Sequence, residues 1–298
     1  MSLGLKDKLF MEKHGFTFQK ILGEGQYGKV VKASSNRMRQ DFAVKIIDRK
    51  NAEPIYLEKF LPRELEIMKC LKHPNVIKTF CVFKGSGSKV FVVTELCDIG
   101  DLSKHIKAKG PLSEEFSKRV FVQLCDAVQY LHGIGIVHRD LKCENLVLDR
   151  NNNIKVCDFS LSKRLSYTDG QPDLSKTCCG TSNYIAPEIL RSLAYNPVVT
   201  DVWSMGVILF KMLYDAFPFS STRALKMAHV KMTRHINFPD TPHVSLEAVE
   251  LILHTSPKRG ASDQHPPHPG GSVDDAGRAG RGRRRVFRSK TRREDWRR

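Results

Sequence analysis

The segment His138–Asn145, followed at Asp158 by a second polar position, constrains this chain more than any other feature of its sequence. Apolar runs at both ends of residues 145–156 enclose a polar turn, which predicts a short hairpin. Because a hairpin returns the chain to the place where it started, we expect Asp158 beside Asp140 and Asn145.

These residue types fit the transfer of a phosphoryl group to a hydroxyl. Asp140 is the candidate to orient the hydroxyl and accept its proton, and Lys142 is the candidate to offset charge on the moving group. Asn145 and Asp158 are candidate ligands of magnesium, which prefers oxygen donors. The predicted catalytic residues are therefore Asp140, Lys142 and Asn145, and the predicted metal ligands are Asn145 and Asp158.

Three glycines, Gly23, Gly25 and Gly28, lie between apolar stretches that predict two strands joined by a tight turn. Glycine lets backbone N–H groups approach phosphate oxygens closely, but this spacing alone also suits a dinucleotide fold or a simple hairpin. The next segment, Phe42–Ile47, predicts another strand, where a dinucleotide fold would need a helix. Lys45 lies in this strand among apolar neighbours, which predicts a buried ion pair.

The segments that follow predict a scaffold for these residues. A helix over Leu57–Leu71 offers Glu64 and Glu66 as partners for Lys45. The apolar run Val90–Leu96 predicts a buried strand. A long amphipathic helix is expected to start at Ser113 and to lead into the segment described first.

Composition and charge limit where the protein works. The eight cysteines are scattered and form no Cys-x-x-Cys pair, which favours reduced thiols over a zinc site. The N-terminus has no secretory core and no glycine after Met1, and the longest apolar stretch, Val202–Leu213, is too short to span a bilayer. We expect a cytoplasmic protein without a membrane partner, with the nucleus as a second location.

The clearest change in composition occurs near residue 255. Residues 255–298 contain 13 Lys and Arg against 5 Asp and Glu, so this segment carries +8 of the net charge of +17. It predicts a basic, Gly-, Arg- and Pro-rich tail that is disordered. The alternative is an arm that binds RNA or directs the protein to the nucleus, but its few aromatic residues make nucleic acid a weaker expectation.

Together these motifs resemble those of eukaryotic serine/threonine protein kinases. Within that group the sequence is most similar to the testis-specific serine kinases, and the resemblance covers roughly residues 15–254. The segments that carry it, with Cys143 in place of the usual proline, are Ile46–Lys50, Lys59–Glu64, His138–Asn145, Ser162–Arg164, Leu174–Thr177 and Arg234–Pro239.

The resemblance implies an α+β, two-lobe protein kinase fold. The smaller lobe would be an antiparallel sheet with one helix, and the larger lobe would be mainly helical. The implied divisions are an extension over 1–14, a kinase domain over 15–254 (15–95, the hinge 96–100 and 101–254) and the tail over 255–298.

The resemblance also assigns a site for ATP and Mg²⁺. It selects Glu64 over Glu66 as the partner of Lys45, places Thr94 at the back of an adenine slot, and leaves Asp101 as either a ribose or substrate contact or a plain helix N-cap. The implied ATP-binding residues are Leu22, Gly23, Gly25, Gly28, Val30, Ala43, Lys45, Glu64, Thr94, Glu95, Leu96 and Val147.

An activation loop is implied between residues 160 and 184. Thr177 is the expected phosphorylation site, and Arg139 is the expected acceptor of its phosphate. Thr181 is expected to orient Asp140 and Lys142, and Asp201 is expected to anchor the backbone of the catalytic loop.

The sequence departs from the family pattern at two places. Ser160 replaces the usual glycine. After Thr255 the resemblance ends, so the lower lobe is expected to be truncated, and the arginine that the family pairs with the position of Glu188 is missing. These losses could together cost several kcal/mol, against a total stability of about 5–15 kcal/mol.

The leading prediction is thus a serine/threonine protein kinase that transfers the γ-phosphate of ATP, with a role in sperm development. Its expected partners are protein substrates with Ser or Thr near basic residues, an upstream activating kinase and a chaperone. The alternatives are a catalytically impaired kinase-like scaffold, because of the missing helices, and nucleic-acid binding through the tail.

Overall fold

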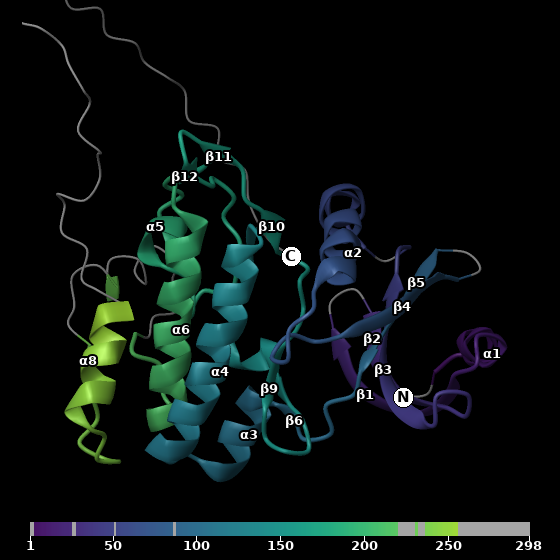
Figure 1. Cartoon of the computed structure of the whole chain (residues 1–298), viewed down its shortest axis with the longest axis horizontal. Helices are drawn as coiled ribbons and strands as arrows, with labels where there is room; N and C mark the ends of the chain where they lie inside the picture. The colour runs from purple at the N-terminus through teal and green to yellow at the C-terminus, as the bar shows by residue number, and fades with distance from the viewer. Residues whose placement is uncertain are drawn as a thin grey trace, which may run out of the picture. The chain divides into compact units, whose positions relative to one another are not determined.

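The computed structural model describes residues 3–25, 28–50, 52–85, 88–219, 230–231 and 236–255. Nearly all of the predicted tail, 255–298, and the segment Arg234–His235 therefore lie outside the described residues. Within the described part, an antiparallel sheet is followed by a mainly helical region (Figure 1). This arrangement is the expected α+β, two-lobe kinase fold.

The N-terminal region is a five-stranded antiparallel sheet in the order β1-β2-β3-β5-β4. Its strands are β1 (Thr17–Gly25), β2 (Gly28–Ser35), β3 (Gln40–Asp48), β4 (Thr79–Lys84) and β5 (Lys89–Glu95). The strands predicted over Phe42–Ile47 and over Val90–Leu96 are confirmed to within two residues. The two strands predicted around the glycines are present as β1 and β2, but they include Gly23, Gly25 and Gly28 themselves.

The two faces of this sheet bury different partners because neighbouring side chains of a strand point to opposite faces. Val44 and Ile46 of β3 belong to a core cluster that also contains Met11 of helix α1 (Leu5–Lys13). Ile47 belongs to the main core with Ile67 of helix α2 (Leu61–Cys70). The predicted N-terminal extension thus contains a helix that packs on the sheet.

The helix predicted over Leu57–Leu71 is irregular at its start. Residues Tyr56–Phe60 form a π-helical turn, η1, in which the N–H of Leu61 donates to the carbonyl of Tyr56, and the α-helix begins only with Leu61. Pro62 explains the change, because it has no N–H to donate to the carbonyl of Glu58.

The C-terminal region is built around two long helices, α4 (Glu114–Gly133) and α6 (Pro197–Tyr214) (Figure 1). The predicted start of α4 is confirmed, since the Ser113 hydroxyl caps it by accepting from the N–H of Phe116. The other helices are α3 (Leu102–Lys109), η2 (Cys143–Asn145), α5 (Pro187–Leu190) and α8 (Leu246–Thr255). The short strands are β6 (Gly100–Asp101), β7 (Ile136–Val137), β8 (Leu146–Leu148), β9 (Ile154–Val156), β10 (Lys163–Arg164), β11 (Tyr167–Thr168) and β12 (Gln171–Pro172).

Helix α6 is also apolar enough to cross a membrane by length and composition alone, with a mean hydropathy of 1.2 over 18 residues. However, 78% of that window is buried inside the protein. Burial among other helices explains its composition as that of a core helix.

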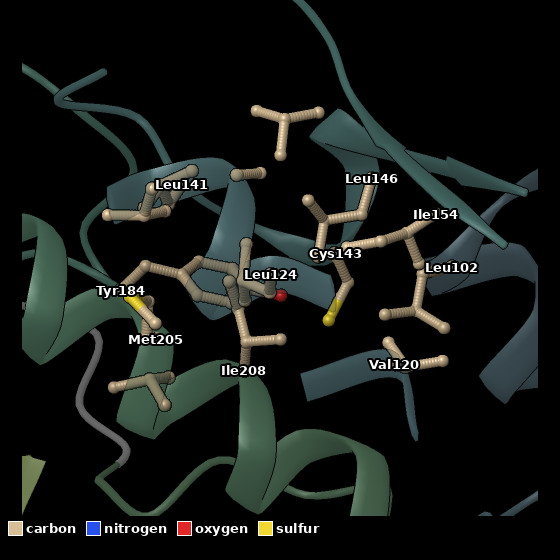
Figure 2. Packing of buried hydrophobic residues seen from close by; sticks show 14 of the residues in the cluster. Leu102, Val120, Leu124, Leu141, Cys143, Leu146, Ile154, Tyr184, Met205 and Ile208 are labelled. Carbon is tan, nitrogen blue, oxygen red and sulfur yellow. The ribbon is translucent and has the colours of Figure 1, made fainter. Parts of the chain in front are cut away.

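The predicted hairpin is present as β8 and β9, although Asn145 belongs to the turn η2 and not to the strand. Apolar side chains from α3, α4, β8, β9 and α6 pack against the catalytic loop, residues 138–145 (Figure 2). Cys143 is fully buried among them, and burial raises the pKa of its thiol to about 12, so it stays protonated and packs as a small apolar group. The packed layer gives the loop above it a fixed base.

Candidate active site

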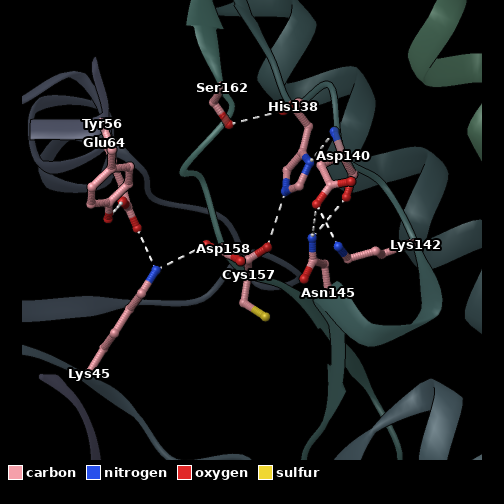
Figure 3. Close-up of polar contacts among 10 residues, drawn as sticks. All are labelled: Lys45, Tyr56, Glu64, His138, Asp140, Lys142, Asn145, Cys157, Asp158 and Ser162. Atoms are coloured by element: carbon pink, nitrogen blue, oxygen red, sulfur yellow. Dashed lines mark hydrogen bonds and ion pairs between the residues drawn. The ribbon is translucent and has the colours of Figure 1, made fainter. Parts of the chain in front are cut away.

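Asp140 lies at the centre of a compact hydrogen-bonded group (Figure 3). Its carboxylate is 2.7 Å from the Lys142 ammonium, and it accepts a hydrogen bond of 2.9 Å from the Thr181 hydroxyl. The same hydroxyl accepts from Lys142 at 2.9 Å. Thr181 therefore holds both groups in place, as the sequence predicted.

Asn145 and Asp158 come from opposite sides of the hairpin. The side-chain amide of Asn145 donates to the carbonyl and the carboxylate of Asp140, at 2.8 and 3.2 Å. With its nitrogen fixed in this way, its oxygen can serve as a metal ligand. One carboxylate and one amide oxygen suit Mg²⁺, which keeps several waters and takes its other ligands from the phosphates of the substrate.

Lys45 joins the two regions of the chain. Its ammonium donates to Glu64 of α2 at 2.7 Å and to Asp158 at 3.0 Å (Figure 3). The ion pair predicted between Lys45 and Glu64 is thus present, and Glu64 is 1% exposed, whereas Glu66 is 68% exposed at its side chain and binds Arg164. The geometry supports the choice of Glu64.

Tyr56 is a member of this group that the sequence analysis missed. Its hydroxyl donates to the second carboxylate oxygen of Glu64 at 3.1 Å. Burial, followed by the nearby charge of Glu64, raises the pKa of this phenol, so it remains a hydrogen-bond donor. The spacing of eight residues, about two helical turns, was the available signal, because such residues share one face.

The charges in this group shift one another's pKa values. Burial acts to lower the pKa of Lys45, but Glu64 and Asp158 outweigh it and raise that pKa above its usual range. Lys45 in turn lowers the pKa of Asp158 from 3.8 to about 2. A lowered carboxyl pKa adds stability that is complete above pH 3.8 and is lost as the pH falls toward 2.

Asp201 of α6 stabilises a strained part of the catalytic-loop backbone. Arg139 has a φ of 66°, in the left-handed region that costs a side-chain-bearing residue about 1–2 kcal/mol. The buried carboxylate of Asp201 accepts hydrogen bonds from the N–H groups of His138 and Arg139, at 2.9 and 2.8 Å. It is also hydrogen-bonded to the Nε2 of His132. The predicted anchoring role of Asp201 is confirmed.

His138 connects the catalytic loop to the chain just before Asp158. Its Nε2 lies 3.1 Å from the carbonyl of Cys157, and the N–H of Asp140 points to its Nδ1 at 3.3 Å. Because a carbonyl can only accept, Nε2 carries the proton and Nδ1 is the acceptor. His138 thus links the backbone of Asp140 to that of the residue before Asp158.

The residues predicted to surround adenine are partly exposed. Ala43 and Thr94 face each other across β3 and β5, where the Thr94 hydroxyl donates to the Ala43 carbonyl at 3.4 Å, and Val30 lies opposite Lys45. Leu22, Gly23 and Gly25 lie on β1, and Val147 lies on β8. Glu95 is the last residue of β5, where its carboxylate binds Lys155, and Leu96 follows it in the chain. That these residues close around a purine stays a prediction.

Gly28 makes the closest backbone approach in this region. A Cβ at this position would lie 1.8 Å from the carbonyl oxygen of Ile46, whereas one at Gly23 would meet nothing within 4 Å. Gly28→Ala is therefore expected to destabilise the protein by about 1–3 kcal/mol, since β2 and β3 must separate to accommodate the methyl group. Gly23→Ala, the matched control, should change stability by less than about 0.5 kcal/mol. Urea unfolding measures both, and equal stability of the two variants would contradict the prediction.

The structure also bears on two residues discussed in the sequence analysis, Asp101 and Ser160. Asp101 is the N-cap of α3, where it accepts from the N–H of Lys104 at 2.9 Å, so the N-cap alternative is present. Ser160 does not have a positive φ, so the observed backbone does not require glycine there.

The missing arginine does not leave Glu188 without a positive charge nearby. The charge of Glu188 acts on the ammonium of Lys231, which lies in the described pair of residues 230–231. The stability cost inferred at this position from the missing arginine therefore does not apply as stated.

The activation segment meets Arg139 through a residue that the sequence did not indicate. Arg139 donates to the carbonyl of Leu161 at 2.7 Å and to the hydroxyl of Ser175 at 3.5 Å. The backbone of Thr177 is held by the Tyr195 hydroxyl, which donates to its carbonyl at 2.8 Å. The structure thus brings Ser175 to Arg139, and phosphorylation of Thr177 stays a prediction.

Comparison with known proteins agrees with this geometry. Residues 16–259 match the protein kinase domain family. Testis-specific serine/threonine-protein kinase 1 of Homo sapiens is 44% identical over 251 residues, which are 84% of this chain and 68% of the relative. Testis-specific serine/threonine-protein kinase 3 of Mus musculus is 37% identical over 82% of this chain and 89% of the relative. CBL-interacting protein kinase 1 of Oryza sativa subsp. japonica is 43% identical over 67% of this chain and 43% of the relative.

A two-lobe fold with a lysine, an acidic partner and a loop of this composition defines an ATP-dependent phosphotransferase, and the chain belongs to the protein kinase family. It is a serine/threonine protein kinase similar to the testis-specific serine/threonine-protein kinases. The predicted family and enzyme class are confirmed, whereas the predicted boundaries at residues 95, 100 and 254 stay predictions.

Proposed function

We propose that this kinase transfers the γ-phosphate of Mg²⁺-bound ATP to Ser or Thr of protein substrates that carry basic residues near the acceptor, and that it acts in sperm development. The observation that carries the chemical part is the Asp140 carboxylate, fixed between Lys142 and Thr181 and bonded by Asn145. The names of the testis-specific relatives motivate the biological part.

In this proposal Asp140 orients the acceptor hydroxyl and takes its proton, because it is the loop carboxylate that Lys142, Thr181 and Asn145 hold in one position. Lys142 offsets charge near the transferred group. Lys45, fixed by Glu64, offers its ammonium to the phosphates of the nucleotide.

Asn145 and Asp158 would hold the magnesium ion, which supplies charge neutralisation on the phosphate oxygens when it is bound. The donor set fits this ion, as argued above. Asp158 is held ready as a carboxylate, since Lys45 keeps its pKa at about 2.

The preference for basic residues rests on Glu144. This side chain is exposed in η2, directly between Cys143 and the predicted metal ligand Asn145. A carboxylate at this place would attract Lys or Arg of a peptide whose hydroxyl has reached Asp140.

The test is transfer of radiolabelled phosphate from ATP and Mg²⁺ to a Ser/Thr peptide with arginines before the acceptor, compared with the same peptide carrying glutamates. We expect transfer to the first peptide and little to the second. A folded, phosphorylated protein that labels neither peptide nor itself would overturn the proposal in favour of a kinase-like scaffold.

Phosphorylation of Thr177 is expected to raise activity. Arg139 contributes, after burial, to lowering the pKa of Arg63, so two guanidinium groups lie close enough to repel each other. A phosphate on Thr177 would relieve this repulsion through charge-assisted hydrogen bonds, each worth about 1.5–3 kcal/mol, or roughly ten- to a hundredfold in an equilibrium.

We therefore expect Thr177→Ala to lower kcat at least about tenfold after treatment with an activating kinase. The matched control is Ser175→Ala, in which Arg139 loses only a neutral contact of 3.5 Å. If the Ser175 variant is the inactive one, Ser175 and not Thr177 is the acceptor.

A further inference from the structure

Lys231 is an unusual lysine because its whole side chain is buried. It is 2% exposed, and its ammonium donates to the carbonyl oxygens of Ser182, Asn183 and Ile185, at 2.8, 3.2 and 2.6 Å. An ammonium has three protons to donate, and all three find acceptors within one short segment.

Such a lysine costs free energy to bury. Burial lowers its pKa to about 7, and the charge of Glu188 only partly opposes this effect. Fully buried lysines are rare unless they are paired or hydrogen-bonded. The three carbonyls and Glu188 provide that compensation, which ties residue 231 to a segment almost fifty positions earlier in the chain.

In the segment 181–185, the carbonyl groups from Ser182 onward accept hydrogen bonds from side chains. Lys231 binds the carbonyls of Ser182, Asn183 and Ile185, and the carbonyl between them, that of Tyr184, accepts from the Ser204 hydroxyl at 3.1 Å. Every carbonyl from Ser182 to Ile185 thus has a side-chain donor, three of them from Lys231.

The same segment begins at the residue that orients the catalytic group. Thr181 bonds both Asp140 and Lys142, and the N–H groups of Tyr184 and Ile185 donate back to the Thr181 carbonyl at 2.8 and 3.2 Å. A displacement of Ile185 would therefore also displace Thr181, which lies beside the position that an acceptor hydroxyl must occupy.

We propose that Lys231 is a positioning residue for the protein substrate: its ammonium fixes residues 181–185 against the catalytic loop, so that a peptide can present its hydroxyl to Asp140. This inference rests on the proposed function for its kinetic consequence. The contacts that the structure describes for Lys231 are with residues 182–185 and include neither the predicted nucleotide ligands nor Asp140, so it should affect the use of peptide and not the binding of ATP.

The kinetic test compares Lys231→Met, which keeps the length and loses the donors, with Lys231→Arg, which keeps donors and charge. For Lys231→Met we expect the peptide KM to rise at least about tenfold while the ATP KM changes less than twofold. Lys231→Arg should restore the peptide KM to within about threefold of wild type, because part of the donor set is retained. The matched control is Lys211→Met on α6, whose ammonium binds Asp215 and which should leave both constants unchanged.

An equal rise of both KM values, or a wild-type peptide KM in Lys231→Met, would overturn the proposal. If Lys231→Met fails to fold, Ser204→Ala removes a single donor to the same segment and should raise the peptide KM by a smaller factor.

Hydrogen–deuterium exchange gives a readout that does not need phosphate transfer. We expect faster exchange at the amides of Tyr184 and Ile185 in Lys231→Met, and no change there in Lys211→Met. If the wild-type protein transferred no phosphate, only the proposed function would be refuted. Unchanged amide exchange in Lys231→Met would refute the role of Lys231.

Discussion

Asp140→Asn is expected to reduce kcat by about 100- to 10,000-fold, the range that a positioned proton acceptor contributes to catalysis. The asparagine keeps the shape of the side chain and can still accept from Thr181, but it cannot take the proton of the hydroxyl. It also loses the charge that binds Lys142 at 2.7 Å. Initial rates of phosphate transfer to a peptide, at saturating ATP, measure the effect.

The matched control for this prediction is Asp149→Asn, in the turn between β8 and β9. Asp149 accepts hydrogen bonds from the N–H groups of Asn151 and Asn153, so its role is local. Its kcat should stay within about threefold of wild type, as for a substitution away from the reacting groups. A wild-type kcat in Asp140→Asn would remove Asp140 from the mechanism.

Glu64→Gln is expected to lower kcat/KM for ATP by about ten- to a hundredfold. Glu64 is 1% exposed and binds both the Lys45 ammonium and the Tyr56 hydroxyl. A buried hydrogen bond to a charged group contributes about 1.5–3 kcal/mol, and its loss would leave Asp158 as the carboxylate that still holds the Lys45 ammonium, so that the ammonium is less firmly positioned for the phosphates. Kinetics with varied ATP measure the change.

Glu66→Gln provides the control within the same helix. Its side chain is 68% exposed, and its ion pair with Arg164 is of the kind that contributes little to stability. We expect kcat/KM for ATP to stay within about twofold of wild type. Similar losses in both variants would indicate a general effect on α2 and would contradict a specific Lys45–Glu64 pair.

Much of this site could be predicted from the sequence because its spacings are short. Asp140, Lys142 and Asn145 lie on one loop, and the hairpin that returns Asp158 is encoded by apolar runs of alternating burial. The start of α4 was also predictable, since Ser113 caps it directly. In each case the physical cause acts within a few residues.

Predictions that depended on contacts between distant segments were less complete. The π-helical turn before Pro62 follows from a missing N–H, but whether the chain widens or breaks there is decided by packing. Helix α1 buries Met11 while Leu5 and Leu9 are 71% and 56% exposed, so its weak pattern gave no reason to expect a helix on the sheet.

The sequence by itself determined the family, the chemistry of the catalytic loop and the order of the strands around the glycines, because local spacing and side-chain type encode them. Only the tertiary structure decided that Ser175 meets Arg139 and that Lys231 lies near Glu188. Their partners belong to different helices and loops, and a buried hydrogen bond across such a distance exists only once the apolar core has brought both elements together.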